Sequence, residues 1–375
     1  MIKDWEIKRL GEVLTLEYGK PLPETDRSPK GKFPVYGANG IKTRTDKFYC
    51  DQYSIIVGRK GSAGEVTLTE EKFWPLDVTY FVTFDDKKFN LKYLFWLLKS
   101  LNLPSYATGV KPGINRNEIY NIEIKVPPLT EQKRIVKILD DKLETLEKLK
   151  DVTEAQSYAA RELFVSRSEE LLTNSNEWEE KTIGDVCFLE NGDRGKNYPS
   201  NAKLQMEGIP FVSAGNLQEQ GIALSERNYL SDKQYSLLRS GKFTSGDILF
   251  CLRGSLGKYA YVNSIDKGAI ASSLVIVRPK DIVSKEYLMS YFGSGLCKKM
   301  IEKYSGGAAQ PNLGAKDLKK FLIYVPTLKE QKVICDELAT LKGQTKELEQ
   351  VFRRKIANLG ELKKSYLNEA FSGKL

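Results

Sequence analysis

The chain carries nearly the same sequence twice, which limits it to folds built from two similar halves. Four segments show the repeat: residues 5–13 (WEIKRLGEV) return at 178–186 (WEEKTIGDV), and residues 126–133 (VPPLTEQK) return at 325–332 (VPTLKEQK). The separation between matched residues grows in one direction, from 173 positions for Trp5 and Trp178 to 199 positions for Gln132 and Gln331. We therefore expect two related domains, with most of the extra length of the second copy between residues 210 and 255.

The size and charge of the chain limit the number of domains it can form and the kind of partner it can bind. A chain of 375 residues is long enough for two or three domains, and the repeat favours two. The net charge of +9 and the pI of about 9.0 favour an anionic partner, because lysine and arginine displace counterions from phosphate groups. Charge alone also fits a basic protein without such a partner.

The sequence predicts a soluble, cytoplasmic protein. Its first residues lack the pattern of a cleavable signal peptide, and its most apolar stretches, 93–98 and 321–325, are too short to span a bilayer. The five cysteines are scattered and form no Cys-x-x-Cys pair, which is typical of reduced thiols in a cytosol.

Composition excludes several classes of catalytic site. The sequence has no histidine, so it can form neither a Ser-His-Asp triad, nor a Cys-His nucleophile, nor an imidazole metal site. Its glycine-bearing loops lack the Lys-Ser/Thr pair of a Walker motif. Glu6 with Lys8, and Glu123 with Lys125, fit half of a metal-nuclease motif, but no convincing Pro-Asp pair precedes them. We expect no catalytic residues, metal ligands or cofactor in this chain; a magnesium-dependent nuclease is the alternative.

The order of predicted elements is the same in both copies. Each copy begins with short runs rich in β-branched and aromatic residues, typical of strands, and continues with a short helix, a glycine-bearing loop and a last strand that ends at a proline. The predicted strands are 53–57, 66–68, 78–84 and 122–126 in the first copy and 248–252, 273–277 and 321–325 in the second. The predicted short helices are 91–100 and 285–292.

After each last strand the apolar pattern changes to a helical period. Residues 129–172 contain no glycine or proline, and residues 328–371 contain only Gly343 and Gly360. A helix of roughly 42 residues is about 63 Å long, so we expect the two helices to pair as an antiparallel coiled coil. The alternative is that each helix packs on its own domain. A heptad pattern predicts these pairing residues: Leu139, Leu146, Leu149, Leu163, Leu338, Leu341, Leu348, Phe352, Leu359 and Leu362.

Together these features predict an α+β fold with approximate two-fold symmetry. Two similar, mixed and strand-rich domains, at residues 1–128 and 173–327, are separated by the two long helices, at residues 129–172 and 328–375. One polypeptide would then offer two similar binding surfaces.

Two pairs of loops carry the residues that we expect to contact nucleic acid. Glycines in the first pair, 58–64 (GRKGSAG) and 252–258 (LRGSLGK), let the backbone approach closely, while arginine, lysine and serine can bind phosphate or a base edge. The second pair is 106–116 and 304–313. The expected contacts are Arg59, Lys60, Ser62, Lys111, Asn115, Arg116, Arg253, Ser255, Lys258, Gln310 and Asn312. Tight basic hairpins and ordinary turns are the alternatives.

A third pair of segments shares a strand that leads into a turn of small residues and then diverges. These segments are 33–40 (FPVYGANG) and 209–216 (IPFVSAGN). Beyond them the two copies place their charged residues differently, as expected if they read different base sequences. The residues expected to contribute here are Lys42, Arg44, Asn216 and Arg227.

The combined motifs resemble the DNA-specificity (S) subunits of type I restriction-modification systems. The resemblance rests on the segment PPLTEQKRIV at 127–136, its echo at 326–335, and the segment LNEAFSGKL at 367–375. It covers the whole chain. The second copy departs from the first at Thr327, which stands in the place of Pro128.

This resemblance implies a DNA-binding subunit of a methyltransferase and endonuclease complex that is not itself an enzyme. Two target-recognition domains would each read one half of a bipartite double-stranded DNA site, held apart by the long helices. The implied partners are two modification (methyltransferase) subunits and restriction subunits, with S-adenosylmethionine, ATP and Mg bound by those partners. Separate and fused partner subunits both fit the sequence. A coiled-coil scaffold without DNA specificity is the structural alternative.

Overall fold

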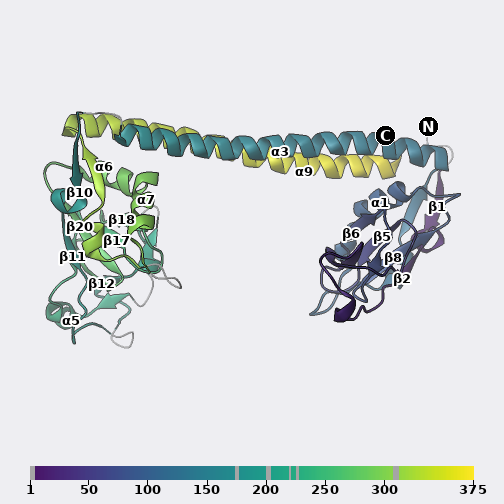
Figure 1. Cartoon of the computed structure of the whole chain (residues 1–375), viewed down its shortest axis with the longest axis horizontal. Coiled ribbons are helices and arrows are strands. Elements are labelled where there is room, and N and C mark those ends of the chain that lie inside the picture. Colours follow the sequence, from purple (N-terminus) through teal and green to yellow (C-terminus); the bar gives the residue numbers. More distant parts are fainter. Residues whose placement is uncertain (1–4, 174–176, 200–203, 219–220, 225–227, 307–311) are drawn as a thin grey trace. The chain divides into compact units, whose positions relative to one another are not determined.

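Each strand-rich domain forms one compact unit with parts of both long helices. The computed structural model describes residues 5–173, 177–199, 204–218, 221–224, 228–306 and 312–375 (Figure 1). One unit comprises Met1–Ala155 and Phe352–Leu375, and the other comprises Gln156–Val351. The long helices therefore do not form a body of their own.

The first domain is built on a four-stranded antiparallel sheet with strand order β2-β8-β5-β6. Its elements are β1 (Glu6–Arg9), β2 (Leu14–Tyr18), β3 (Phe33–Gly37), β4 (Gly40–Thr45), β5 (Ser54–Gly58), β6 (Val66–Thr69), β7 (Trp74–Pro75), β8 (Thr79–Phe84), α1 (Leu91–Ser100), α2 (Arg116–Tyr120) and β9 (Glu123–Val126). A second sheet has the order β4-β3-β7, and β1 pairs with β9. Helix α1 lies against β5 and β6, where Tyr93, Leu94 and Leu97 enter the main core.

The second domain repeats this plan. Its main sheet has the order β11-β20-β17-β18, and β10 pairs with β21 as β1 pairs with β9. Its elements are β10 (Glu179–Thr182), α4 (Ile183–Val186), β11 (Cys187–Asn191), β12 (Ile209–Val212), β13 (Leu217–Gln218), β14 (Gly221–Ile222), β15 (Tyr229–Leu230), α5 (Asp232–Leu237), β16 (Lys242–Thr244), β17 (Ile248–Cys251), β18 (Tyr259–Tyr261), β19 (Lys267–Ile270), β20 (Leu274–Pro279), α6 (Lys285–Phe292), α7 (Gly295–Tyr304), α8 (Ala315–Leu318) and β21 (Leu322–Val325). The extra length of this copy holds β13 to β16 and α5, where the first domain has only β4. The predicted mixed fold with two similar domains is confirmed.

Two buried glutamines, at matching positions of the repeated segments 126–133 and 325–332, join the long helices to their domains. Gln132, near the start of α3 (Leu129–Thr173), is fully buried; its amide nitrogen donates to the carbonyls of Lys88 (3.0 Å) and Pro127 (2.9 Å). Gln331, near the start of α9 (Leu328–Ser372), donates to the carbonyls of Ile282 and Pro326, both at 2.9 Å. Each side chain clamps the first turn of a long helix to the strand before it and to the loop before the short helix.

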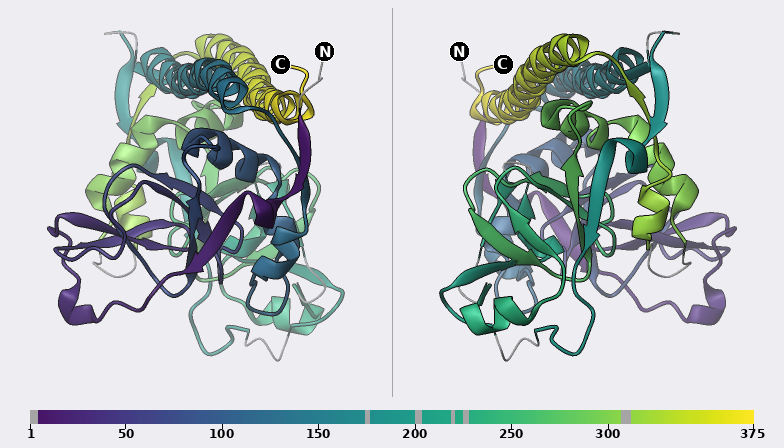
Figure 2. Two further views of the ribbon diagram at one scale, coloured as in Figure 1. Left: turned by 90° about the vertical axis from the view of Figure 1, so that its right-hand side faces the viewer. Right: turned by 90° about the vertical axis from the view of Figure 1, so that its left-hand side faces the viewer.

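The long helices run antiparallel where they meet. In the first unit Lys142 lies over the Tyr366 ring at 4.0 Å, and Lys363 pairs with Glu147 at 2.9 Å, so the partner number falls as the α3 number rises. In the second unit Arg167 pairs with Glu337 at 2.9 Å. In Figure 2, β1 (purple) runs from the level of the helices down into the first domain. The predicted helix pairing is confirmed, and the alternative also holds in part, because each helix end packs into a domain core.

The strict heptad pattern is wrong for part of each helix. Leu149 (41%), Leu163 (66%), Leu348 (47%) and Leu362 (39%) are exposed. Half-buried positions occur one residue later, at Lys150 and Phe164 in α3 and at Glu349 and Lys363 in α9. The buried stripe of each helix therefore departs from the strict seven-residue pattern in these stretches. The remaining predicted pairing residues, Leu139, Leu146, Leu338, Leu341, Phe352 and Leu359, are buried or half-buried.

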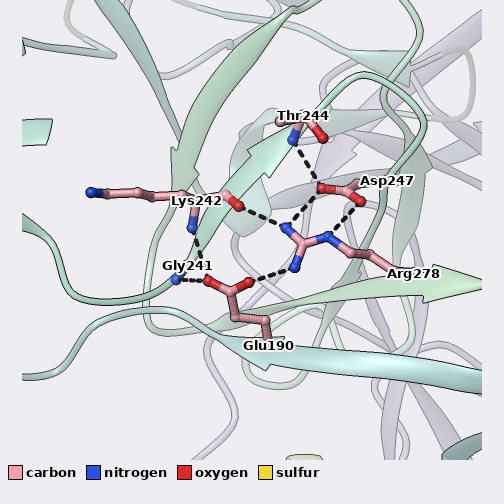
Figure 3. A network of polar contacts seen from close by, with 6 residues as sticks. All are labelled: Glu190, Gly241, Lys242, Thr244, Asp247 and Arg278. Atoms are coloured by element: carbon pink, nitrogen blue, oxygen red, sulfur yellow. Dashed lines mark hydrogen bonds and ion pairs between the residues drawn. The ribbon is translucent and has the colours of Figure 1, made fainter. Parts of the chain in front are cut away.

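A polar network joins the sheets of the second domain (Figure 3). The Arg278 guanidinium donates to Glu190 (2.5 Å), to Asp247 (2.9 and 3.1 Å) and to the Lys242 carbonyl (2.7 Å). Glu190 in turn accepts the Gly241 backbone N–H at 2.6 Å. Burial acts to raise the pKa of Glu190, but the hydrogen bonds from Arg278 and Gly241 outweigh it and hold that pKa below its usual 4.5.

Candidate nucleic-acid interface

The glycine loops, residues 58–64 and 251–257, form the same turn in both domains. The Gly64 N–H donates to the Gly58 carbonyl at 2.8 Å, and the Gly257 N–H donates to the Cys251 carbonyl at 3.0 Å. The turn passes through Gly61 (φ +83°) in the first domain and through Gly254 (φ +80°) in the second. A positive φ favours glycine, so the repeated glycines follow from the shape of the turn.

The second pair of loops lies directly beside the glycine loops. We call residues 107–114 and 305–313 the proline loops; residues 307–311 lie outside the described structure. The Ile114 N–H donates to the Arg59 carbonyl at 3.0 Å, and the Leu313 N–H donates to the Leu252 carbonyl at 3.0 Å. The loops that were predicted separately therefore adjoin one another in each domain, through the same backbone contact.

In the first domain the adjoining loops present basic and small polar side chains, and they also border a hollow. Lys60, Ser62 and Lys111 are exposed. The hollow measures about 650 Å³ and is lined in part by Ser62 and Pro112. These side chains can contact an anionic surface without rearrangement of the fold.

Other predicted residues of the first domain form hydrogen bonds within the protein. The Arg59 guanidinium donates twice to the Asp77 carbonyl (3.0 and 2.6 Å), and Arg116 donates to the Leu16 carbonyl at 2.9 Å. The Asn115 side chain caps α2 by accepting the Asn117 N–H at 3.0 Å. The arginines keep unused donors, whereas the capping oxygen of Asn115 is already engaged.

In the second domain the same position carries Arg253, Ser255 and Lys258. The first two are exposed and Lys258 is half-exposed. Arg253 Nε donates to Asn312 Oδ1 at 2.9 Å, so this pair links the two loops through side chains as well as backbone. Gln310 lies outside the described residues.

The third predicted group separates into exposed and structural residues. Lys42 is exposed on β4. Arg44 donates to the carbonyls of Gly31 (2.8 Å) and Lys32 (2.5 Å) and therefore braces a turn; its DNA contact stays a prediction. Asn216 is 7% exposed and uses its amide group inside the domain, so it is also structural. Arg227 lies outside the described residues.

Sequence reasoning missed two side chains at this interface. Tyr18, at the end of β2, lies between the Arg59 and Arg116 guanidiniums, at 5.3 and 4.7 Å from its ring centroid. Val110 is fully exposed at the tip of the first proline loop, next to Lys111. A valine among turn residues gives no sequence signal, and the neighbours of Tyr18 are distant along the chain.

The geometry does not favour the nuclease alternative. In the antiparallel pair of β1 and β9, Glu6 lies opposite Val126 while Glu123 lies opposite Arg9, so the two carboxylates stand at opposite ends of the ladder. Within the described part of the chain, no group of three or more Cys, Asp or Glu residues could hold a metal ion. Burial raises the pKa of the Cys187 and Cys297 thiols to about 12, which makes them poor nucleophiles.

The described residues also contain no helix that is both long enough and apolar enough to cross a membrane. Both 45-residue helices are too polar, with charged residues along their exposed faces.

The comparisons with known proteins identify the family. The model of the type I restriction modification DNA specificity domain matches the chain twice, at residues 2–155 and 175–357. The chain belongs to this family. Type I specificity subunits recognise DNA and carry no catalytic activity of their own, so this specificity subunit is not an enzyme.

Relatives and solved structures agree with this placement. The type I restriction enzyme MjaVIII specificity subunit of Methanocaldococcus jannaschii is 25% identical over 100% of this chain and 93% of its own length. The EcoBI specificity subunit of Escherichia coli is 20% identical over 95% of this chain and 80% of its own length.

Two solved structures share the fold. The crystal structure of the HsdS subunit from Thermoanaerobacter tengcongensis has a TM-score of 0.61 at 19% identity, covering 100% of this chain and 98% of that one. A chain from a structure titled for complex assembly and conformational transition of the type I R-M system has a TM-score of 0.76 at 19% identity, covering 100% and 99%.

Proposed function

We propose that this specificity subunit reads a bipartite double-stranded DNA target, with one domain on each half-site. The observation that carries the proposal is the repeated pair of adjoining loops, which places exposed Lys60 and Ser62 in one domain and exposed Arg253 and Ser255 in the other. Different side chains on one backbone frame suit two different half-sites.

The division of labour between these side chains follows from their chemistry. Lysine is a point charge on a flexible stem, so Lys60 and Lys111 would contact phosphates and position the domain. Arginine, asparagine and serine can distinguish base edges in the major groove, so Arg253 and Asn312 would contribute to sequence reading in the second domain. The target bases depend on loop geometry and DNA shape together.

The same proposal includes partner subunits. Two modification subunits would bind S-adenosylmethionine and methylate the DNA that this chain selects, and restriction subunits would use ATP and Mg. The absence of histidine from the sequence supports leaving the chemistry to partners. Such a complex would work in the cytoplasm, where the DNA is.

Sequencing of methylated bases in cells that express this chain with its modification partner tests the proposal. We expect one two-part motif. Replacing residues 177–325 by the same domain of another family member should change one part of the motif and leave the other intact. A change in both parts, or in neither, would contradict the reading of one half-site per domain.

Two further experiments test the rest of the proposal. Removal of seven residues from each long helix at matched positions should shorten the spacer of the motif; an unchanged spacer would refute a spacing role for the helices. Purified chain with Mg and duplex DNA should show salt-sensitive binding without cleavage. Duplex binding that is independent of salt concentration would favour a coiled-coil scaffold without DNA specificity. Cleavage of the duplex would favour the magnesium-dependent nuclease.

A further inference from the structure

Tyr18 organises two arginines at the surface of the first domain. It is the last residue of β2, and 48% of it is exposed. The Arg59 Cζ lies 5.3 Å and the Arg116 Cζ 4.7 Å from the centroid of its ring. A guanidinium within about 6 Å of an aromatic ring is attracted to the ring face. One exposed ring therefore holds two positive charges.

Both guanidiniums are also anchored from the protein side. Arg59 Nε and Nη2 donate to the Asp77 carbonyl, and Arg116 Nη1 donates to the Leu16 carbonyl. These bonds use two of the five N–H groups of Arg59 and one of the five of Arg116. The remaining donors are fixed in position and available to a ligand.

Their charge is not neutralised by the protein. Among the residues that the structure describes, neither Arg59 nor Arg116 forms an ion pair with a carboxylate; their partners are carbonyl oxygens and the Tyr18 ring. Two like charges beside one ring repel each other. An anion that accepts from both guanidiniums would relieve this repulsion.

We propose that Tyr18, Arg59 and Arg116 form a clamp for one phosphodiester group of the DNA bound by the first domain. The inference rests on the proposed function and deepens it. Guanidinium groups match the oxygens of a phosphate and form short, charge-assisted hydrogen bonds with it. Because both arginines are hydrogen-bonded at the base of the glycine and proline loops, they would act with Lys60 and Lys111 in fixing the position of the domain on the duplex, which leaves base contacts to other side chains of the loops.

The second domain lacks this clamp. The residues at the same structural positions are Asn191 at the end of β11, Leu252 after β17, and Ala315 at the start of α8. None of them carries a charge. The two half-sites are therefore held differently, and the first domain supplies an ionic contact that the second does not repeat.

The test is the salt dependence of duplex binding by the full chain. Arg116→Gln should lower the magnitude of the slope of log K against log [salt] by about 0.9, the value for one phosphate contact. Tyr18→Leu should lower it by a similar amount, whereas Tyr18→Phe and Arg116→Lys should retain most of the slope. Lys148→Gln, an equal charge change on the exposed face of α3, is the matched control.

The methylated motif and the melting temperature complete the test. The clamp predicts an unchanged motif in Arg116→Gln, because a phosphate contact carries no base information. Slopes equal to that of Lys148→Gln in variants that melt like the wild type would overturn the clamp. An altered motif with an unaltered slope would overturn the phosphate assignment in favour of base reading. Wild-type chain without salt-dependent duplex binding would instead overturn the proposed function itself.

Discussion

The side-chain oxygen of Gln132 accepts the backbone N–H of Asn90 at 2.9 Å, across 42 positions of sequence. Gln331 accepts the backbone N–H of Ser284 at 2.7 Å in the second domain. In each case the bonded residue is also the N-cap of the short helix. The Asn90 side chain accepts the Tyr93 N–H at the start of α1, and the Ser284 side chain caps α6 in the same way. The repeated glutamine of the sequence is therefore explained by a structural role.

Substitution of either glutamine should destabilise its own domain. Gln132→Leu leaves three backbone groups without their partner, and such a group costs about 1–3 kcal/mol, so we expect a loss of at least about 3 kcal/mol in the free energy of unfolding. Hydrogen exchange should show the loss in the first unit. Gln331→Leu should shift it to the second unit, and exposed Gln156→Leu is the control. Equal effects of Gln132→Leu and Gln156→Leu would contradict the stabilising role of Gln132.

Helix α9 should become more stable when its glycines are replaced. A Cβ at Gly343 or Gly360 would meet no atom within 4 Å, so each alanine variant should gain about 0.5–1 kcal/mol from the better helix propensity. A Cβ at Gly31 would collide with the Thr45 backbone, so Gly31→Ala is the opposite control. Urea denaturation measures both. A loss of stability in Gly343→Ala would show that this residue needs glycine for a reason other than packing.

The second domain should lose stability in acid through Glu190. Its pKa in the folded chain is lowered from 4.5, so its contribution is complete above pH 4.5 and disappears as the pH falls below that value through the folded pKa. Glu190→Gln should cost roughly 1–2 kcal/mol at neutral pH, reduced by partial exposure, and should flatten the acid dependence. Urea denaturation as a function of pH measures this. Glu17→Gln, at the same position of β2, is the matched control substitution.

Val110 should affect base preference without affecting folding. Its side chain is fully exposed, so Val110→Ser should change the free energy of unfolding by less than about 0.5 kcal/mol. An apolar side chain beside Lys111 can contact a thymine methyl group, and loss of that contact should relax the methylated motif at one base pair. The salt slope should stay constant. A motif unchanged in Val110→Ser would remove this residue from base reading.

The sequence predicted the parts of the fold that depend on local pattern. The repeated motifs located two domains, and the bounds of α1 and α6 agree with the predicted helices. Helix α7 was missed because it begins with glycine inside a region read as a loop. Its signal was Ser294, whose hydroxyl caps the helix by accepting the Cys297 N–H.

The shape of the predicted loops follows from local sequence, whereas the engagement of several predicted side chains depends on tertiary contacts; their contacts with DNA stay predictions. The glycine loops recur because their turn needs glycine. By contrast, the sequence marked Arg44 and Asn216 only as polar, and their engagement by Gly31, Lys32 and Ser213 depends on the folded chain. The role of Tyr18 could not be predicted for the same reason, because only the folded chain brings Arg116 next to it.

The division of the long helices has a consequence for how the chain can be made. Leu367 and Ala370 are buried in the core of the first domain, and Arg134 donates to the Leu375 carbonyl at 2.7 Å. A ribosome delivers those residues after the whole second domain has emerged. The first domain is therefore synthesised first but can complete its core only last, when the end of α9 becomes available. The second domain does not depend on those residues.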